Sequence, residues 1–505
     1  MKKTIIIYPL LLGIYPILFL FSTNVALFPL NDLWVSLIIV VGAISLTWIL
    51  TYLILKSSHK SALLVALSWT TVLSYNQIFG PLQGLKVLGF VLGSNRILVS
   101  FWAVILLISG YFIIKSQRNF ANLTRMVNIV SIVLVLFSVF NIVIYECKNR
   151  DKYQDSIVSE MYIPEGQPRI MGKLPDIYYL IFDRYASSTT LKESYGYDNI
   201  EFINFLKAKG FYVAEQSHAN YSTTVLSLAS SLNMNYLVLP LSSKKNRNND
   251  QTRYSQRITD NKVLRFLKSQ GYSTVHFGSW FWPTGYNPNA DVNINYSYLP
   301  FRGFALIMFE QSLLYPIFRL FYKLDSGILS AFDKISLLPD EGSPKFVFAH
   351  ILLPHEPFIF DRDGMLLSSY EKLNTSEKEK YLNQLIFTTK KIETLTEVLL
   401  SKSQYPPVII IQSDEGPYLD MIEDKEPLSN SVIEKRTGIL NAYYLPGVKN
   451  IYLYSSMTPV NTFRVIINEY FKTNYSLLDD KIYYIKNASS MFDYTDVTKM
   501  VFEIN

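Results

Sequence analysis

Acidic and basic side chains stand in pairs at two points where a phosphoryl-transfer site would need them. Asp183 and Arg184 directly follow one strongly apolar run, and Asp414 and Glu415 directly follow another. A divalent cation takes oxygen ligands from carboxylates and hydroxyls and also accepts imidazole. Such a cation neutralises charge on a phosphoryl group and lowers the pKa of a nearby hydroxyl. The acidic residues of the two pairs are therefore a candidate metal site.

Hydroxyl side chains gather where a helix is expected to begin, in the stretch NYSTTVLSLASSLNMNYL at 220–237. One interpretation is structural, because Ser222 or Thr223 can cap a helix that runs to about Leu232. The other is catalytic, because free N–H groups and the helix dipole favour a bound phosphate at a helix N-terminus. A Thr in the first turn would then be the nucleophile.

Two histidines lie near the end of a third apolar run. His350 lies inside KFVFAHIL at 345–352, and His355 follows in LPHEP. Either imidazole could protonate the oxygen that departs from phosphorus. Each candidate has an ordinary explanation when taken singly, since an Asp after a strand commonly forms a turn. Three strand ends of this kind, together with a Thr at a helix start, favour a common site.

The elements that must position these residues alternate between strands and helices. Strand-like runs are expected at 176–182, 211–216, 272–278, 345–352 and 407–413. Helices are expected between them, for example at 260–269 and at 376–402, which opens with a capping box at Ser376. Continuous apolar runs indicate strands covered on both faces, so we predict an α/β domain with a mostly parallel central sheet between helices. In such sheets ligands lie beyond the carboxyl ends of the strands.

Apolar residues make up 49% of the 505-residue chain and concentrate before residue 147. Five windows stand out, at about 4–22, 35–55, 62–80, 97–114 and 126–145. Each approaches the ~20 residues that cross a bilayer, so we predict an α-helical membrane domain of five transmembrane helices over 1–146. The basic residues that set the orientation are Lys2, Lys3, Lys56, Lys60, Lys115, Arg118 and Arg125 on one side and Lys86 and Arg96 on the other.

This asymmetry predicts a multi-pass protein of the cell membrane with a cytoplasmic N-terminus. Residues 147–173 are expected to form a linker, and 174–505 an extracytoplasmic catalytic domain. The single cysteine, Cys147, permits no intrachain disulfide. The apolar segment 303–322 is almost long enough to span, and we expect it to lie on the outer membrane surface or inside the domain. A net charge of +6 with scattered basic residues argues against nucleic-acid binding.

The motifs follow the order found in the membrane-anchored branch of the sulfatase/alkaline phosphatase superfamily, which includes lipoteichoic acid synthases and phosphoethanolamine transferases. The resemblance covers the five-helix plan and most of 174–505. The segments that carry it are PDIYYLIFDRYAS at 175–187, TVLSLASS at 224–231, GYSTVHFGSW at 271–280, FAHILLPHEP at 348–357 and TPVNTFRVIINEYF at 458–471. In the same order, these segments resemble the first metal-binding strand of the family, its T-x-x-S nucleophile segment, a G-Y-x-T strand, the transferases' substrate-binding segment and a C-terminal segment of sulfatase-like proteins. The resemblance implies an alkaline-phosphatase-like fold.

The resemblance also implies individual roles. It points to Thr224 as the nucleophile, with His350 and His355 as further catalytic residues. One divalent metal, Mn or Zn with Mg as a further candidate, would be bound by Asp183, Thr224, Asp414 and Glu415. Arg184 and His355 would bind the substrate.

Two features depart from the family pattern. Formylglycine-dependent sulfatases need C-x-P-x-R or its Ser equivalent, whereas the nucleophile here is a Thr, so sulfate-ester hydrolysis by that route is not expected. QSDEGP at 412–417 has Glu415 where the family usually has His. A carboxylate in place of an imidazole favours a harder cation such as Mn²⁺ or Mg²⁺, or indicates an inactive site.

The leading hypothesis is a membrane-bound, metal-dependent phosphotransferase. Thr224 would attack the phosphorus of a phospholipid donor, diacylglycerol would leave, and phosphoglycerol or phosphoethanolamine would pass to an envelope glycan or lipid acceptor through a phospho-Thr intermediate. One alternative is a phosphodiesterase or phosphatase of the same superfamily. Another is a catalytically inactive relative that binds glycan and supports envelope assembly, with Trp280 and Trp282 as candidate sugar-stacking residues.

Overall fold

The fold is taken from a computed structural model. It describes residues 4–25, 28, 30–82, 86–87, 90–91, 95–158, 174–237, 251–294, 303–318, 325–340, 342, 344–417, 428–448, 452–485 and 493–502. The chain divides into two compact units, one formed by 1–159 with 299–323 and the other by 160–298 with 324–505. Each unit is described by itself.

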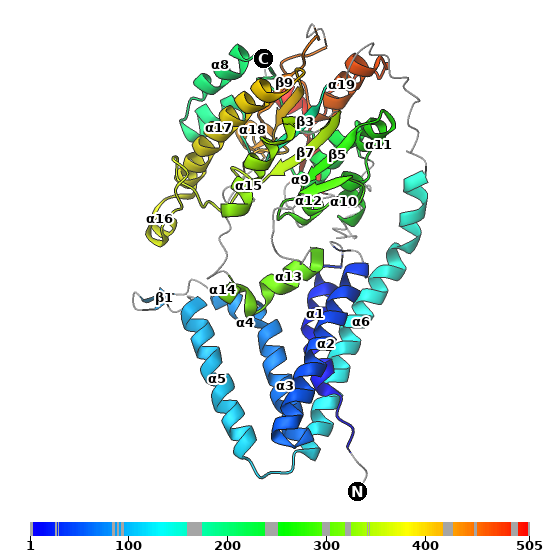
Figure 1. Ribbon diagram of the computed structural model, residues 1–505, viewed down its shortest axis with the longest axis vertical. Helices are drawn as coiled ribbons and strands as arrows, with labels where there is room; N and C mark the ends of the chain where they lie inside the picture. Colours follow the sequence, from blue (N-terminus) through cyan, green and yellow to red (C-terminus); the bar gives the residue numbers. More distant parts are fainter. Residues whose placement is uncertain are drawn as a thin grey trace. The chain divides into compact units, whose positions relative to one another are not determined.

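The first unit is helical (Figure 1). Its N-terminal elements are α1 (Tyr8–Thr23), α2 (Leu30–Leu55), α3 (Ser58–Leu73), α4 (Tyr75–Phe79), η1 (Gly80–Leu82), β1 (Lys86–Val87), β2 (Phe90–Val91), α5 (Asn95–Lys115) and α6 (Ala121–Val158). Five of the helices fall on the five predicted windows. Among the described residues, three stretches are long and apolar enough to cross a membrane: Leu30–Leu55, Ile97–Lys115 and Ala121–Cys147.

The helices α1 and α3 are shorter, with 16 residues each. Membrane crossing by all five helices therefore stays a prediction. Large apolar side chains on the long helices point outward, for example Ile38, which is 72% exposed, and Leu107, which is 73% exposed. Exposed apolar faces of this kind are expected of helices whose solvent is lipid. Helix α6 continues to Val158, into the expected linker, whose positions 159–173 lie outside the described residues.

The apolar segment 303–322 forms two short helices of the first unit, α13 (Gly303–Gln311) and α14 (Leu314–Phe318). Phe304 packs edge-on against Phe21 with ring centroids 5.0 Å apart. Asn76 Nδ2 donates a hydrogen bond of 3.1 Å to Gln311 Oε1. The break between the helices means that this segment packs against neighbouring helices and does not form one long spanning helix.

The second unit is built on a seven-stranded sheet with the strand order β4-β9-β8-β3-β7-β5-β6. In that order the strands are β4 (Tyr212–Val213), β9 (Asn441–Tyr444), β8 (Val408–Gln412), β3 (Ile177–Phe182), β7 (Lys345–Ile351), β5 (Ser273–Phe277) and β6 (Val292–Ile294). Every neighbouring pair is parallel except the two pairs that β9 makes. The predicted mostly parallel sheet is confirmed, and its three central strands are buried along their whole length.

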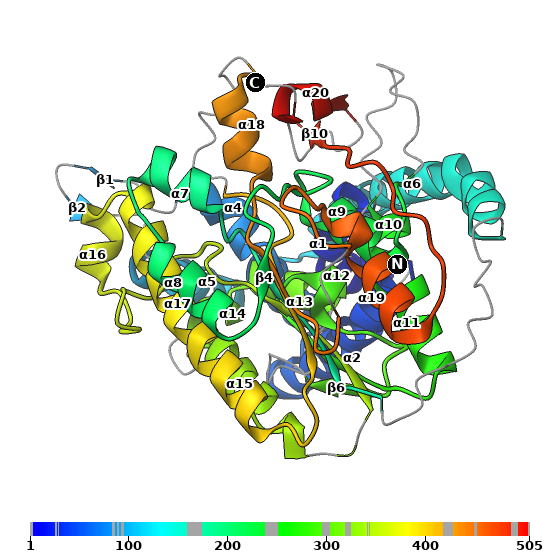
Figure 2. The same cartoon turned by 90° about the horizontal axis from the view of Figure 1, so that it is seen from above.

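Helices cover both faces of this sheet (Figure 2). One face packs against α9 (Thr224–Asn233), α10 (Thr252–Thr259), α11 (Lys262–Ser269) and α19 (Thr462–Phe471). The other packs against α7 (Ser188–Tyr195), α8 (Ile200–Ala208), α15 (Asp325–Ile335) and α17 (Glu377–Lys402). Smaller elements complete the unit: α12 (Trp282–Gly285), η2 (Leu338–Asp340), α16 (Ser369–Asn374), α18 (Asn430–Thr437), η4 (Pro459–Asn461), β10 (Tyr483–Ile485), β11 (Tyr494–Asp496) and α20 (Thr498–Phe502). Two buried apolar layers, one on each face, form the core.

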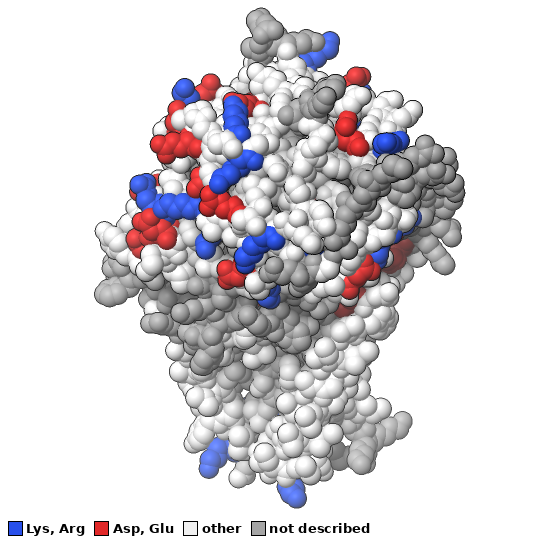
Figure 3. All heavy atoms as spheres, turned by 45° about the horizontal axis from the view of Figure 1, so that its top comes forward, with Lys and Arg blue, Asp and Glu red and all other residues white. Residues whose placement is uncertain are grey.

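Basic and acidic side chains are interspersed over the visible face of this unit (Figure 3). Neither sign forms a continuous patch there. Mixed charge of this kind is typical of an ordinary water-facing surface.

Candidate functional site

The register of the three central strands places the candidate residues on one face of the sheet. Ile181 pairs with His350 on β7 and with Gln412 on β8. Asp183 and Asp414 each lie two residues beyond a member of this row. Because side chains alternate between faces along a strand, both carboxylates lie on the same face as His350. This is the face that α9 covers.

Asp183, His350 and Asp414 form a compact buried group. Each offers one ligand atom, and these atoms lie within 4.8 Å of one another. His350 Nε2 is 3.4 Å from Asp183 Oδ2. The three residues are 1% to 3% exposed, yet Asp183 Oδ1, His350 Nε2 and both carboxylate oxygens of Asp414 have no hydrogen bond of full geometry within the described part of the chain. Buried polar atoms are normally partnered, so these four point to a ligand.

Electrostatics support the same conclusion. Burial, together with repulsion from Asp183, raises the pKa of Asp414 to about 7. Burial raises the pKa of Asp183 to about 6, although His355 and Arg184 oppose the rise. Burial also lowers the pKa of His350. A bound cation would offset the repulsion between the carboxylates, so these residues fit a divalent metal.

Thr224 is the first residue of α9 and is partly buried. Its side chain lies near enough to Asp414 to lower the pKa of that carboxyl. The capping interpretation is wrong for the two preceding hydroxyls. Thr223 occupies the cap position but makes no capping hydrogen bond, and Ser222 Oγ instead accepts a 2.8 Å hydrogen bond from the N–H of Ile485. The helix start thus presents Thr224 beside the buried carboxylates.

Arg184 lies between two carboxylates on the other side of the strand end. Its Nε donates to Glu415 Oε1 at 3.1 Å and its Nη1 donates to Glu356 Oε2 at 2.6 Å. Its backbone has a φ of 63°, in the left-handed region that a non-glycine residue rarely occupies. A backbone conformation of this kind persists where the surrounding structure fixes the residue.

Glu415 does not join the compact group, because its carboxylate faces Arg184. Burial raises the pKa of Glu415, and the Arg184 and Arg436 guanidinium groups oppose the rise. Metal binding by Glu415 and substrate binding by Arg184 both stay predictions. The structure supplies an imidazole to the group from His350 on β7, a residue that the sequence suggested as an acid catalyst.

His355 lies on the loop after β7, with its side chain 15% exposed. The Trp280 ring stands edge-on to it, with centroids 5.7 Å apart. His355 is close enough to lower the pKa of Asp183. It therefore lies beside the group without joining it, as an acid catalyst would, and its catalytic and substrate-binding roles stay predictions.

Gln384 on α17 holds this loop and was missed in the sequence. Its Nε2 donates to Pro354 O at 3.2 Å and to His355 O at 2.8 Å, and its Oε1 accepts from the N–H groups of Ile359 at 2.9 Å and Phe360 at 3.2 Å. All four hydrogen-bonding positions of the amide are used, in a fully buried side chain. The only sequence signal was a polar residue on the buried face of a long amphipathic helix.

Gly416 explains the glycine in the DEGP turn. A Cβ there would clash with the carbonyl of Lys435, because the loop after Asp414 packs directly on α18. The N–H of Gly416 donates to Arg436 O at 3.0 Å. This contact fixes the loop that carries Asp414.

A sulfatase family model matches residues 186–466, more than half of the chain, and the chain therefore belongs to the sulfatase family. This membership agrees with the sulfatase-like motifs of the sequence, and three described helices are long and apolar enough to cross a membrane. No curated protein matches the chain.

Several solved structures are similar to it. The integral membrane protein lipooligosaccharide phosphoethanolamine transferase A (EptA) from Neisseria meningitidis is 13% identical, with 92% of this chain and 95% of that chain covered and a TM-score of 0.39. The C-terminal periplasmic domain of EcEptC from Escherichia coli in complex with Zn is 11% identical, with 60% and 84% covered and a TM-score of 0.42. A protein in the alkaline phosphatase superfamily from Vibrio parahaemolyticus is 12% identical, with 63% and 74% covered and a TM-score of 0.41.

Proposed function

We propose that this protein is a membrane-bound, metal-dependent phosphotransferase that moves a phospholipid head group onto an envelope glycan or lipid outside the cytoplasm. One observation carries the proposal. Four buried atoms, Asp183 Oδ1, His350 Nε2 and both carboxylate oxygens of Asp414, have no hydrogen bond of full geometry among the described residues, at the point where α9 begins with Thr224. The apolar helices support a membrane location, where both the donor and its diacylglycerol product would reside.

Asp183, His350 and Asp414, together with the Thr224 hydroxyl, would hold one divalent cation. Two carboxylates, one imidazole and one hydroxyl suit Mn²⁺ or Zn²⁺. When bound, the cation supplies positive charge that lowers the pKa of the Thr224 hydroxyl and stabilises negative charge on the phosphoryl oxygens.

Thr224 is the nucleophile. Its Oγ1 forms a bond to phosphorus while the bond from phosphorus to the diacylglycerol oxygen breaks, and Asp414 is placed to accept the hydroxyl proton. The N–H groups at the start of α9 hold the phosphoryl oxygens. His355, which is partly exposed, donates the proton that diacylglycerol needs to leave. An acceptor hydroxyl then attacks phosphorus and gives its proton to His355, the bond from phosphorus to Thr224 Oγ1 breaks, and Asp414 returns the proton to the Thr224 oxygen.

The buried group favours this function over a catalytically inactive, glycan-binding relative. Glu415 stands where related proteins usually have an imidazole, but His350 brings an imidazole to the carboxylates from the neighbouring strand. The charge of Glu415 is offset by Arg184. A nitrogen ligand would therefore come from a different position of the fold.

The test is diacylglycerol release by the full-length protein in mixed micelles of detergent with phosphatidylethanolamine or phosphatidylglycerol. We expect metal-dependent release by the parent protein and by Thr224→Ser, and a mass increase on Thr224 equal to the head-group phosphate. Thr224→Ala should still bind metal but lose release by at least about 10³-fold, because it has no nucleophile. Release by Thr224→Ala at the parent rate would refute the mechanism.

The same assay separates the alternatives. A phosphodiesterase or phosphatase would release the free head-group phosphate at the same rate with and without a glycan acceptor, whereas a transferase would attach it to the acceptor. A glycan-binding relative would instead lose envelope function in Trp280→Ala and keep it in Thr224→Ala.

A further inference from the structure

Thr284 is buried directly behind His350. Its Oγ1 lies 2.8 Å from His350 Nδ1, the ring nitrogen that faces away from the carboxylates. Thr284 is fully buried on the short helix α12, which follows β5. His350 is therefore bounded by the carboxylates at Nε2 and by a hydroxyl at Nδ1.

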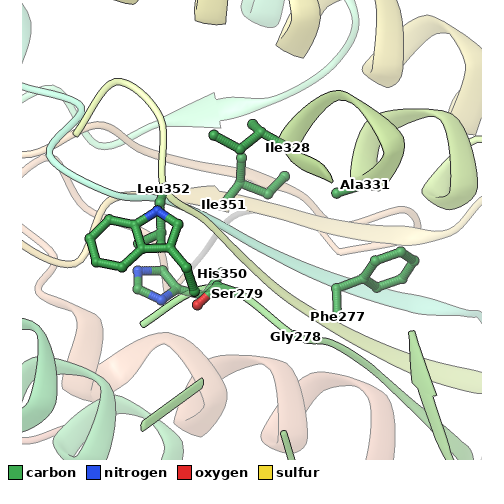
Figure 4. A pocket seen from close by; sticks show the side chains of 9 residues that line it. Phe277, Gly278, Ser279, Ile328, Ala331, His350, Ile351 and Leu352 are labelled. Carbon is green, nitrogen blue, oxygen red and sulfur yellow. The ribbon is translucent and has the colours of Figure 1, made fainter. Parts of the chain in front are cut away.

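A short loop holds the Thr284 hydroxyl in place. Thr284 Oγ1 lies 2.8 Å from Ser279 Oγ, and Figure 4 shows Ser279 beside His350. The N–H of Thr284 donates to Phe281 O at 3.0 Å, and the N–H of Ser279 donates to Thr284 O at 3.2 Å. These bonds close the loop on itself and restrain the backbone at Thr284, while the contacts with Ser279 Oγ and His350 Nδ1 restrain its hydroxyl. Ser279 and His350 also line the apolar pocket shown in Figure 4.

A second histidine supports the loop from the sheet. His276 Nε2 donates to Thr284 O at 2.9 Å, and the His276 ring stacks on Phe348 with centroids 5.4 Å apart. Burial lowers the pKa of His276 to about 4, so this ring is neutral and adds no charge near the carboxylates. The backbone at Thr284 is thus fixed on both sides.

The hydroxyl suits a ring that must bind metal through Nε2. A metal-bound neutral imidazole carries its proton on Nδ1, and that proton needs an acceptor. Thr284 Oγ1 accepts it and donates its own proton to Ser279 Oγ, which in turn has Phe281 O at 3.3 Å. The hydroxyl chain therefore ends at a backbone carbonyl, with a lone pair of Nε2 directed at the carboxylates.

We propose that Thr284 is a positioning residue that sets the tautomer and orientation of His350 for metal binding. This role rests on the metal site of the proposed function. Loss of a partner of this kind typically weakens metal affinity by about 10-fold to 100-fold, which is the effect expected for Thr284→Val.

The test uses the full-length protein in detergent, treated with a chelator and titrated with Mn²⁺ and Zn²⁺ by calorimetry. Thr284→Val and Thr284→Ala should weaken both dissociation constants about 10-fold to 100-fold, and Thr284→Ser should restore them. The matched control is Thr388→Val, because Thr388 is also fully buried but its hydroxyl donates to Gln384 O within α17. The visible spectrum of the Co²⁺-loaded protein should change in the two Thr284 variants that lack the hydroxyl and not in the control.

The failures of the two proposals are distinguishable. Parent-like dissociation constants in Thr284→Ala would overturn the positioning role and leave the metal site intact. If the parent protein binds neither ion, the metal site of the proposed function is wrong and the positioning role is refuted with it. If Thr284→Val does not fold, Thr284→Ala decides, because it removes the hydroxyl without adding a methyl group beside the ring.

Discussion

Replacing Asp414 by Asn should stabilise the metal-free protein. The Asp414 carboxyl is 1% exposed and its pKa is raised from 3.8 to about 7 by burial and by repulsion from Asp183. A carboxyl whose pKa is raised by folding stabilises the folded state only while it is protonated. The Asp414 carboxyl therefore lowers the free energy of unfolding of the parent protein increasingly as pH rises from about 4 to about 7, and this loss of stability is constant above that range.

The size follows from the shift. Roughly three pKa units at 1.36 kcal/mol per unit give at most about 4 kcal/mol, part of which local rearrangement relieves. Asn has nearly the same shape and no charge, so Asp414→Asn removes the penalty. We expect equal stability of the two proteins near pH 4 and a variant that melts several degrees higher at pH 8.

The assay is thermal unfolding of the full-length protein in detergent with a chelator, measured across this pH range. Asp333→Asn on α15 is the control, since Asp333 is exposed. Added Mn²⁺ or Zn²⁺ should reverse the order of the two melting temperatures, because metal binding to the folded state stabilises only the protein that keeps the metal site. A metal-free parent protein that is as stable as Asp414→Asn at pH 8 would refute the conclusion that Asp414 is a buried, unpartnered charge.

Three further predictions follow from the same geometry. Metal affinity should rise steeply between about pH 5 and pH 8, and metal binding should release protons, because the raised pKa values of Asp183 and Asp414 keep these carboxyls partly protonated. Calorimetry in buffers of different ionisation enthalpy measures both the affinity and the proton release. A metal affinity that does not change with pH would contradict this prediction. Gly416→Ala should weaken metal binding and lower the free energy of unfolding by about 1 to 3 kcal/mol, because the Cβ of the alanine would clash with the Lys435 carbonyl. Unchanged metal binding in the titration would show that the loop can shift freely. Gln384→Leu should lower turnover more than metal affinity, because it releases the His355 loop from all four hydrogen bonds. Gln384→Glu keeps an acceptor for the N–H groups of Ile359 and Phe360 and should lose less turnover. Equal loss of turnover and metal affinity would contradict a loop-specific role.

The central strands were predictable because they are buried on both faces. The apolar runs 176–182 and 407–413 match β3 and β8 to within a residue at each end. The edge strand β4 lies within the predicted run 211–216. Two other strands were missed, for physical reasons: β6, at the opposite edge, has three residues, and β9, next to β4, begins with the buried polar residue Asn441. Short or polar strands depend on pairing with neighbouring strands, and the local sequence alone does not reveal that pairing.

The candidate site, too, was predictable only in part. The sequence could identify Asp183, His350 and Asp414 as chemically capable residues at strand ends, but not which of two adjacent acids faces the site. Asp414 and Glu415 are neighbours, so alternation sends their side chains to opposite faces. The pairing of Gln412 with Ile181 decides the choice: it turns Asp414 toward Asp183 and His350, and leaves Glu415 to Arg184. An Asp-Glu pair can therefore occupy this strand end with only the Asp in the buried group, while His350 on β7 brings an imidazole to that group and Arg184 offsets the charge of Glu415.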